Sequence, residues 1–380
     1  MWSYVPLEKV ANICDGLRKP VNSKERAKRI EGKLNESLFP YYGATGQVGY
    51  IDDYLTDGEY VLLGEDGAPF LNPFASKAYI ISGKAWVNNH AHILQSKSNN
   101  KFLCYYLNYF DYNSYVSGTT RLKLTQAQLK RIEIPDISKD EQQRIVSCIE
   151  ELFSELDKGV ETLQTIKEQL AVYRQAVLKE AFGPITQYIP FENCMDSRLG
   201  KMLDKEKNTG TFHKYLRNVN VRWFSFDLSD LFEMRIEDSE IEKYTISYGD
   251  LVICEGGEPG RCSVWTKDKT ICYQKALHRV RFTDGSNPYF YMYYLWFAAQ
   301  IGKLTEYYTG TGIKHLTGQS LIKIPVPTTT RATQDKIVEI IESRLSVCDS
   351  IERTVDTALA QAEAMRQSIL KKAFEGELCK

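Results

Sequence analysis

RQAVLKEAF, at Arg174–Phe182, occurs a second time near the end of the chain as RQSILKKAF, at Arg366–Phe374. The similarity extends upstream without a gap, so that Ser117–Phe182 aligns with Thr309–Phe374 at a constant shift of 192 positions, and about a third of the aligned residues are identical. A repeat with a period of half the molecule indicates two copies of one structural unit. The chain of 380 residues is long enough for two units, each with its own core.

Each copy ends in a region with the pattern of one long helix. Ser138 and Glu141 have the spacing of a capping box, and Gly183-Pro184 would end the helix. Apolar residues recur between them at steps of mostly three and four, and the second copy has a matching stripe. Equivalent helices of two similar units usually pack about a twofold axis, so we predict a pseudo-twofold repeat joined by an antiparallel coiled coil. A helix that lies along its own domain is the alternative.

The globular part of each copy combines both kinds of secondary structure. Short β-rich runs bounded by Gly, Asn or Ser include EYVLLG, KAYIIS, HAHILQ, DLVICE and HRVRF. The longer apolar runs KFLCYYLNYF and YFYMYYLWFAAQIGKL predict helices on these sheets. Short helices capped by Thr125 and Thr317 precede strands that we expect to stop at Pro135 and Pro327. The pattern predicts an α+β fold, with globular domains at 1–137 and 183–330, a long helix at 138–182, and a second long helix with a C-terminal tail at 331–380.

Composition sets few limits on function. Hydrophobic residues make up 43% of the chain and charged residues 26%, as in ordinary globular proteins. The start, MWSYVPLEKV, lacks the pattern of a signal peptide, and the most apolar stretch, YFYMYYLWFAA, is too short to span a bilayer. We therefore expect a cytoplasmic protein without a membrane partner. The net charge of −1 is no sign of a nucleic-acid-binding protein.

The sequence contains no pattern typical of a catalytic or metal centre. The motifs G-x-x-x-x-G-K-[ST], G-x-S-x-G and H-E-x-x-H are absent, and NPFA at Asn72 and NPYF at Asn287 lack one proline of an adenine methyltransferase motif. The nine cysteines include no C-x-x-C pair and are expected to be structural. His90 and His92 could point the same way from a strand, but without a third ligand they are more simply core or surface histidines. We predict no catalytic residue and no metal site.

The order of several motifs resembles a known family. The first copy contains YYGATGQVGYIDDY, GEDGAPF and ISGKAWVNNHAHIL, and the second contains YLRNVNV, YGDLVICEGG and YQKALHRVRF, each followed by its RQ-x-x-L-K-x-A-F helix end. Over essentially its whole length the chain is similar to the specificity subunits of type I restriction-modification systems. The two globular domains would then be target-recognition domains.

The resemblance implies a DNA-reading subunit that has no catalysis of its own. Such a subunit binds a bipartite, asymmetric target in double-stranded DNA, one half-site per domain, and its long helices set the gap. It would recruit two modification subunits that methylate adenine with S-adenosylmethionine, and two ATP-driven restriction and translocase subunits. S-adenosylmethionine, ATP and Mg would be bound by these partners and no cofactor by this chain. The alternatives are a self-contained methyltransferase or nuclease and a coiled-coil adaptor between proteins.

Residues that contact DNA should be polar or basic, lie on loops, and mostly differ between the copies. Arg121 and Lys314, in GTTRLK and GTGIKH, are exceptions that could bind phosphate in both copies, or could equally be residues at the start of a helix. The candidates are Arg18 and Lys19 in the basic run 18–33, Tyr42, Thr45, Gln47, Lys77, Arg121, Arg217, Asn218, Asn220, Arg222, Arg261, Lys275 and Lys314.

The helices provide the second set of candidate residues. The matched ends should dock on the opposite domain or on a modification subunit, which is a task common to both copies. The residues expected in the helix pair or its subunit interface are Ile145, Ile149, Leu156, Leu163, Leu170, Arg174, Leu178, Phe182, Ile337, Ile341, Ile351, Val355, Arg366, Leu370 and Phe374.

Overall fold

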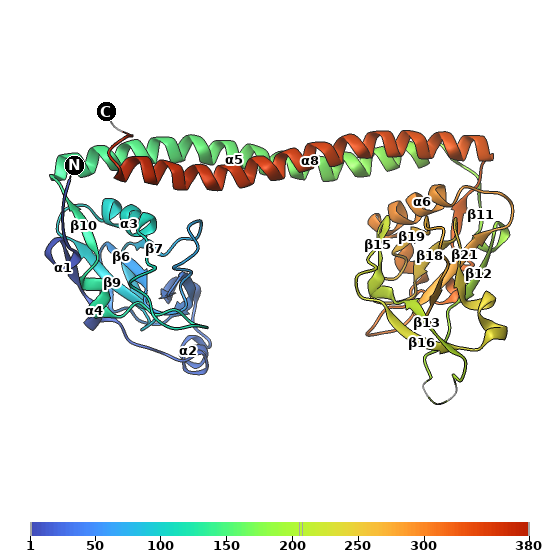
Figure 1. The fold of residues 1–380 in the computed structure, drawn as a ribbon, viewed down its shortest axis with the longest axis horizontal. Helices are drawn as coiled ribbons and strands as arrows, with labels where there is room; N and C mark the ends of the chain where they lie inside the picture. Colours follow the sequence, from blue (N-terminus) through green and yellow to red (C-terminus); the bar gives the residue numbers. More distant parts are fainter. Residues whose placement is uncertain (1, 205, 207, 379–380) are drawn as a thin grey trace. The chain divides into compact units, whose positions relative to one another are not determined.

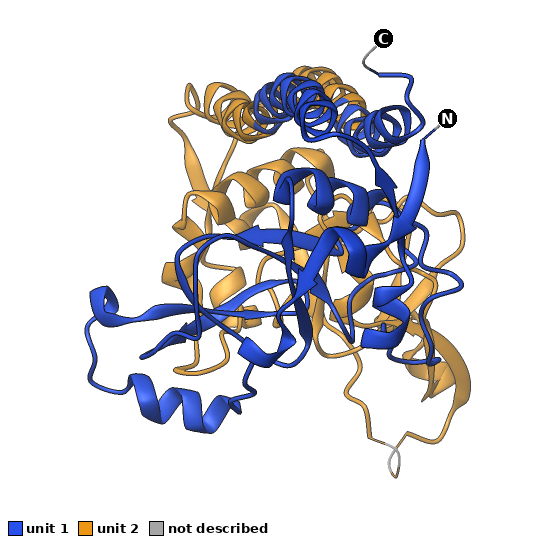
Figure 2. Ribbon diagram, turned by 90° about the vertical axis from the view of Figure 1, so that its left-hand side faces the viewer, with its two compact units in different colours: residues 1–164, 355–380 blue, residues 165–354 orange. Residues whose placement is uncertain are grey.

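The computed structural model describes residues 2–204, 206 and 208–378. The chain forms two compact units, of which unit 1 comprises Met1–Gln164 and Val355–Lys380 and unit 2 comprises Thr165–Thr354 (Figure 2). Each unit therefore contains one globular part and a portion of each long helix. Among the described residues, no helix is both long and apolar enough to cross a membrane.

Unit 1 is built on two four-stranded sheets (Figure 1). One is antiparallel with the order β2-β9-β6-β7, and the other is mixed with the order β4-β3-β8-β5, in which β3 and β8 are parallel. A separate antiparallel pair, β1-β10, joins the start of the domain to its end. The strands are β1 Ser3–Pro6, β2 Ala11–Ile13, β3 Phe39–Gly43, β4 Gly46–Ile51, β5 Thr56–Asp57, β6 Tyr60–Gly64, β7 Ala78–Ile81, β8 Lys84–Val87, β9 Ala91–Ser96 and β10 Glu133–Asp136.

Unit 2 repeats this topology strand for strand. Its sheets have the orders β12-β21-β18-β19 and β16-β13-β20-β17, with the pair β11-β22 at the ends of the domain and one inserted hairpin, β14-β15. The single parallel pairing, between β13 and β20, matches that of β3 and β8. The repeat and the α+β class are thus confirmed. The strands are β11 Tyr188–Pro190, β12 Met195–Leu199, β13 Thr211–Leu216, β14 Val221–Arg222, β15 Ser225–Phe226, β16 Phe232–Ile236, β17 Thr245–Ile246, β18 Leu251–Cys254, β19 Cys262–Val264, β20 Ile271–Tyr273, β21 Leu277–Phe282 and β22 Pro325–Pro327.

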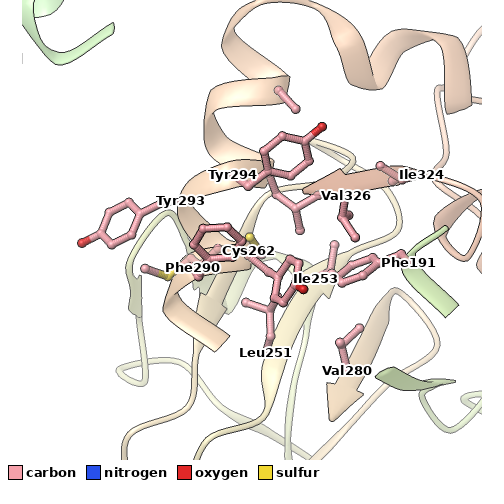
Figure 3. Packing of buried hydrophobic residues seen from close by; sticks show 14 of the residues in the cluster. Phe191, Leu251, Ile253, Cys262, Val280, Phe290, Tyr293, Tyr294, Ile324 and Val326 are labelled. Atoms are coloured by element: carbon pink, nitrogen blue, oxygen red, sulfur yellow. The ribbon is translucent and has the colours of Figure 1, made fainter. Parts of the chain in front are cut away.

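One apolar helix packs on the antiparallel sheet of each unit. These are α3, Asn100–Tyr109, and α6, Pro288–Gln300, and both were expected. Each begins at an asparagine cap, because Asn99 and Asn287 accept hydrogen bonds from backbone amides in the first turn. Figure 3 shows the core under α6, where Phe290 and Tyr294 face strand residues such as Ile253.

The short helices also begin where the sequence predicts. The Thr125 hydroxyl accepts from the amide of Gln128, and that of Thr317 accepts from the amide of Ser320. One expectation was wrong, because Pro135 lies inside β10 and does not stop it. Proline is tolerated there since β10 pairs with β1 alone and needs no donor on its other edge. The short helices are α1 Leu7–Val10, α2 Ser23–Ile30, α4 Gln126–Lys130 and α7 Gly318–Leu321.

The long helices are α5, Lys139–Phe182, and α8, Arg331–Phe374. The Ser138 hydroxyl caps α5 by accepting from the amide of Glu141 at 3.3 Å. Within each unit the two helices run antiparallel, as the sequence predicts. Ion pairs between them include Asp157–Arg366 in unit 1, and Arg174–Asp349, Arg174–Glu352 and Glu180–Arg344 in unit 2.

The matched helix ends lie in the cores of the globular domains. Phe182, at the end of the helix that follows the first domain, packs in unit 2 on Phe290, Tyr294 and Phe297. In unit 1, Phe374 packs in the same way on Phe102, Tyr106 and Tyr109. Each helix therefore ends against the globular domain of the other copy.

Some residues of the apolar stripe on the long helices are exposed to solvent, although the stripe was expected to face the partner helix. Ile351 is 41% exposed, whereas its neighbours Cys348 and Val355 on the same helix are buried. Tyr173 and Met365 are also exposed. Leu156, Leu163 and Ile337 are half-buried. The predicted helix residues that are buried are Ile145, Ile149, Leu170, Leu178, Phe182, Ile341, Val355, Leu370 and Phe374.

Candidate nucleic-acid interface

In unit 1, two loops that are far apart in the sequence lie side by side. The loop 65–69 follows β6, and the loop 117–123 precedes α4. The amide of Leu124 donates to the carbonyl oxygen of Glu65 at 2.7 Å, and the buried His92 donates through Nε2 to the carbonyl oxygen of Leu124 at 2.9 Å. The histidine thus fixes the second loop against the sheet.

Unit 2 contains the same loop pair, formed by residues 255–259 and 309–315. The amide of Leu316 donates to the carbonyl oxygen of Glu255 at 2.7 Å, and Nε2 of His278 donates to the carbonyl oxygen of Leu316 at 2.9 Å. Burial lowers the pKa of His278, so its ring is held in the neutral form. The residues that the two copies share at this place therefore build a common platform.

A third segment, which differs between the copies, lies beside each loop pair. In unit 1 it is the tip of the β3-β4 hairpin, where the carbonyl oxygen of Ala44 is 3.1 Å from the position that a Cβ on Gly64 would occupy. In unit 2 it is the segment 217–227, where Asn218 Nδ2 donates to the carbonyl oxygen of Gly256 at 3.2 Å. These variable segments carry Thr45 and Gln47 in unit 1, and Arg217, Asn218 and Arg222 in unit 2.

The arginines predicted to bind DNA in unit 1 are paired with carboxylates. Arg18 forms ion pairs with Asp15 and Glu65, and Arg121 contacts Asp66 at 2.9 Å. Such pairs fix the direction of a guanidinium and leave its remaining donors available. Lys19 is exposed.

The arginines of unit 2 are held in the same manner. Arg217 pairs with Asp230 at 2.7 Å, and its guanidinium stacks on the ring of Phe232. Arg261 pairs with Glu258 at 2.8 Å and donates to the carbonyl oxygen of Asn218 at 3.0 Å. Arg261 thus joins the loop pair to the variable segment.

Three other basic candidates of unit 2 are exposed. Lys314 donates to the carbonyl oxygen of Gly310 at 3.0 Å, within the loop 309–315. Arg222 and Lys275 have no ion-pair partner among the described residues. The side chains of Arg222 and Lys275 are therefore available to a ligand.

Three candidates have structural positions. Lys77 is only 3% exposed, and its ammonium donates to the carbonyl oxygens of Pro73 and Asn108. Asn220 is 2% exposed and binds the backbone of its own turn, and the half-buried Tyr42 packs on Tyr79. The structure therefore corrects the prediction that Lys77 and Asn220 contact DNA, since neither side chain reaches the surface.

Among the described residues, the histidines and cysteines form no metal-binding cluster. His90 is hydrogen-bonded to Asp66 and His92 to Asp15, and no group of three or more His, Cys, Asp or Glu side chains is placed to hold a metal ion. The eight described cysteines are free thiols, five of which lie in buried positions of unit 2 or the long helix α8: Cys194, Cys254, Cys262, Cys272 and Cys348.

Two features beside the variable segments were not predicted. The helix α2 begins at Asn22, whose side chain accepts from the amide of Glu25 at 2.9 Å, and the N-x-x-E spacing could have signalled it. In the β14-β15 turn, Phe224 adopts a φ of 65°, which is rare for an aromatic residue, and packs on Trp296 of α6. No local sequence pattern indicates this turn.

Glu65 and Glu255 occupy equivalent positions in the two copies but have opposite electrostatic environments. Burial alone would raise the pKa of Glu65, but hydrogen bonds from Arg18 and Lys123 lower it below its usual range. Burial raises the pKa of Glu255, and the charges of His315 and Lys275 oppose this only in part. Ionised Glu65 therefore stabilises unit 1, whereas ionised Glu255 does not stabilise unit 2.

Replacing Glu65 by glutamine should lower the free energy of unfolding by about 1–3 kcal/mol at neutral pH, because Arg18 loses a charged partner. Because folding lowers the pKa of Glu65, ionised Glu65 stabilises the folded protein at pH values above its pKa in the unfolded chain. This stabilisation is lost as the pH falls through its pKa in the folded protein. The deficit of E65Q relative to wild type should therefore shrink on acidification. Urea unfolding at several pH values measures this. The matched variant E255Q should cost little at neutral pH, and an equal deficit in both variants would contradict the assignment.

Comparison with known proteins identifies the family. A family model described as type I restriction modification DNA specificity domain matches residues 1–170 and 196–361. A type I restriction enzyme specificity subunit of Haemophilus influenzae is 27% identical over 375 residues, covering 95% of this chain and 92% of that protein. The EcoKI specificity subunit of Escherichia coli K12 is 26% identical over 287 residues, covering 70% and 62%.

Solved structures share the fold. A chain from work on complex assembly and conformational transition of the type I R-M system has a TM-score of 0.74 at 15% identity, covering 99% of this chain and 98% of the other. The HsdS subunit of Thermoanaerobacter tengcongensis has a TM-score of 0.55 at 15% identity, covering 99% and 97%. The matches extend over both repeats, and the chain belongs to the family of type I restriction-modification DNA specificity proteins.

Proposed function

We propose that the chain is the DNA-specificity subunit of a type I restriction-modification complex and binds a bipartite, asymmetric target. The observation that carries this proposal is the repeated loop pair with a different variable segment beside it in each unit. A shared platform suits the contacts to phosphate that every DNA sequence offers, and side chains that differ between the units suit contacts to bases. One half-site would thus belong to each unit.

The partners follow from the same proposal. Double-stranded DNA would be bound together with two modification subunits and two restriction and translocase subunits. Those partners would bind S-adenosylmethionine, ATP and Mg, so that this chain binds no cofactor and catalyses no step. The name of one structural relative refers to assembly of such a complex, which supports the protein partners. A cytoplasmic location remains a prediction of the sequence.

A methyl-transfer assay separates this function from the alternatives. The purified chain, the modification subunit and the two together are incubated with host DNA and labelled S-adenosylmethionine. Label should enter adenine only in the combined sample. Label with the chain alone would instead indicate a self-contained methyltransferase. Absence of label in a combined sample that has assembled would favour an adaptor between proteins.

The long helices should set the gap between half-sites. Inserting seven residues, about two turns, into α5 and the facing part of α8 keeps the apolar stripe in phase. We expect the number of unspecified bases in the methylated motif to change and both half-sites to stay the same. Sequencing of methylated bases measures this. Half-site sequences that change with helix length would contradict the role of the helices as a spacer.

A further inference from the structure

The helix α2 of unit 1, Ser23–Ile30, is attached to its sheet in an unusual way. None of its residues is buried, so it has no apolar face to hold it in place. Eight residues are too few for a stable isolated helix. Cation–π contacts attach it instead. The guanidinium of Arg26 lies over the ring of Tyr41, and that of Arg29 lies over the ring of Trp86.

Those two rings also fix the chain that leads into the helix. Tyr41 and Trp86 are buried, and the Tyr41 hydroxyl donates to the carbonyl oxygen of Val21 at 3.1 Å. The indole nitrogen of Trp86 donates to the carbonyl oxygen of Lys19 at 2.7 Å. Rings of the mixed sheet therefore set both the entry of α2 and its inner face.

A single carboxylate neutralises the end of this region. Arg29 and Lys33 both contact Asp52 at 2.6 Å, and these hydrogen bonds hold the pKa of Asp52 below its usual range. The outer side of α2 has no such partner. Lys24 and Lys28 are exposed, stand one turn apart, and form no ion pair with any residue in the described part of the chain.

The charge of this region is strongly positive. Residues 18–33 contain seven Lys or Arg (18, 19, 24, 26, 28, 29, 33) and two Glu (25, 31), a net charge of 7 − 2 = +5 in a chain whose total is −1. Arg26 reaches the carbonyl oxygen of Val48 in β4, close to Gln47 of the variable hairpin. The inner face of α2 thus lies against the hairpin that carries the candidate base-reading side chains, and Lys24 and Lys28 are on its exposed side.

From these observations we propose that the outer face of α2, formed by Lys24 and Lys28, binds the phosphate backbone of DNA beside the half-site of unit 1. This inference rests on the proposed function and assigns one task within it. Evenly spaced, unpaired lysines on a helix without base-reading side chains suit phosphates, which carry no sequence information. The described residues between β12 and β13, the corresponding stretch of unit 2, contain no helix, so the proposal concerns unit 1.

The test compares two double variants of the full chain. K24Q/K28Q removes both charges and keeps good helix formers. The control, K9Q/K130Q, removes two exposed lysines of the same unit on α1 and α4. Affinity is measured at increasing salt for a random-sequence duplex and for a duplex that contains the methylated motif. K24Q/K28Q should weaken both by on the order of tenfold at moderate salt and reduce the salt slope by up to about 2, because each phosphate contact contributes about 0.9.

The outcomes separate this inference from the function on which it rests. Equal salt slopes for wild type and K24Q/K28Q, with motif preference intact, would overturn the inference alone. An equal loss in K9Q/K130Q would also overturn it, because the effect would then be one of net charge. Unchanged DNA affinity with weaker assembly with the modification subunit would assign α2 to an acidic protein surface instead. A wild-type chain that shows no motif preference in its complex would contradict the proposed function itself.

Discussion

Replacing Phe374 by alanine is expected to lower the free energy of unfolding of unit 1 by about 3–5 kcal/mol, the usual cost of removing a buried phenylalanine. The ring is 2% exposed and contacts Phe102, Tyr106 and Tyr109, the last at a centroid distance of 5.4 Å. Its loss would leave a cavity between α3 and the end of α8. Urea unfolding measures the loss, and hydrogen exchange of α3 amides localises it.

The equivalent variant in the second copy should act on the other unit. Phe182 is 1% exposed and packs on α6, so F182A should destabilise unit 2 by a similar amount and increase hydrogen exchange there. Y173A and M365A, on the exposed side of the same helices, should change stability by less than about 0.5 kcal/mol. If F374A and F182A kept full stability but no longer bound a partner subunit, the prediction would be contradicted, and the helix ends would be docking sites for that partner.

Replacing Arg222 by glutamine should affect one half-site only. Arg222 is exposed, lies in the variable segment of unit 2, and has no ion-pair partner among the described residues. A lost arginine contact to a base costs about 1–3 kcal/mol, or roughly 5- to 150-fold in affinity, and relaxes the sequence at one position. Affinity for duplexes altered at each motif position measures this effect.

The counterpart in unit 1 is Q47A, in the β3-β4 hairpin. Gln47 is exposed, and its side-chain amide donates to the carbonyl oxygen of Gly49 in its own strand. Q47A should relax the other half-site and leave the half-site of Arg222 unchanged. If both variants relaxed the same half-site, the assignment of one half-site to each unit would be wrong. A uniform loss over all sequences would move that residue to the phosphate contacts.

Features that depend on local pattern could be predicted from the sequence. The repeat was visible because residues of the cores and helix ends, such as Phe182 and Phe374, are the same in both copies. The helices α3 and α6 were visible as dense apolar runs, and the caps at Thr125 and Ser138 through their side chains. Family resemblance added the function, which composition and a net charge of −1 do not indicate.

Features that depend on distant contacts could not be predicted. The partners of Arg18 include Glu65, and the burial of Lys77 depends on Asn108, and neither contact is visible in a sequence window. The helix α2 was missed because its attachment uses stacked arginines and no apolar face. Ile351 was misplaced because a stripe with mixed steps of three and four does not determine which of two neighbouring positions faces inward.

The central claim is that two variable segments on a repeated platform define a two-part DNA target. The most direct test is to map methylated bases in a host that carries the modification subunit, with and without this chain. The account predicts a split adenine-methylated motif that appears only with the chain. It also predicts that R222Q relaxes one half of that motif and Q47A the other. No new motif despite an assembled complex, or a continuous motif without a gap, would contradict it.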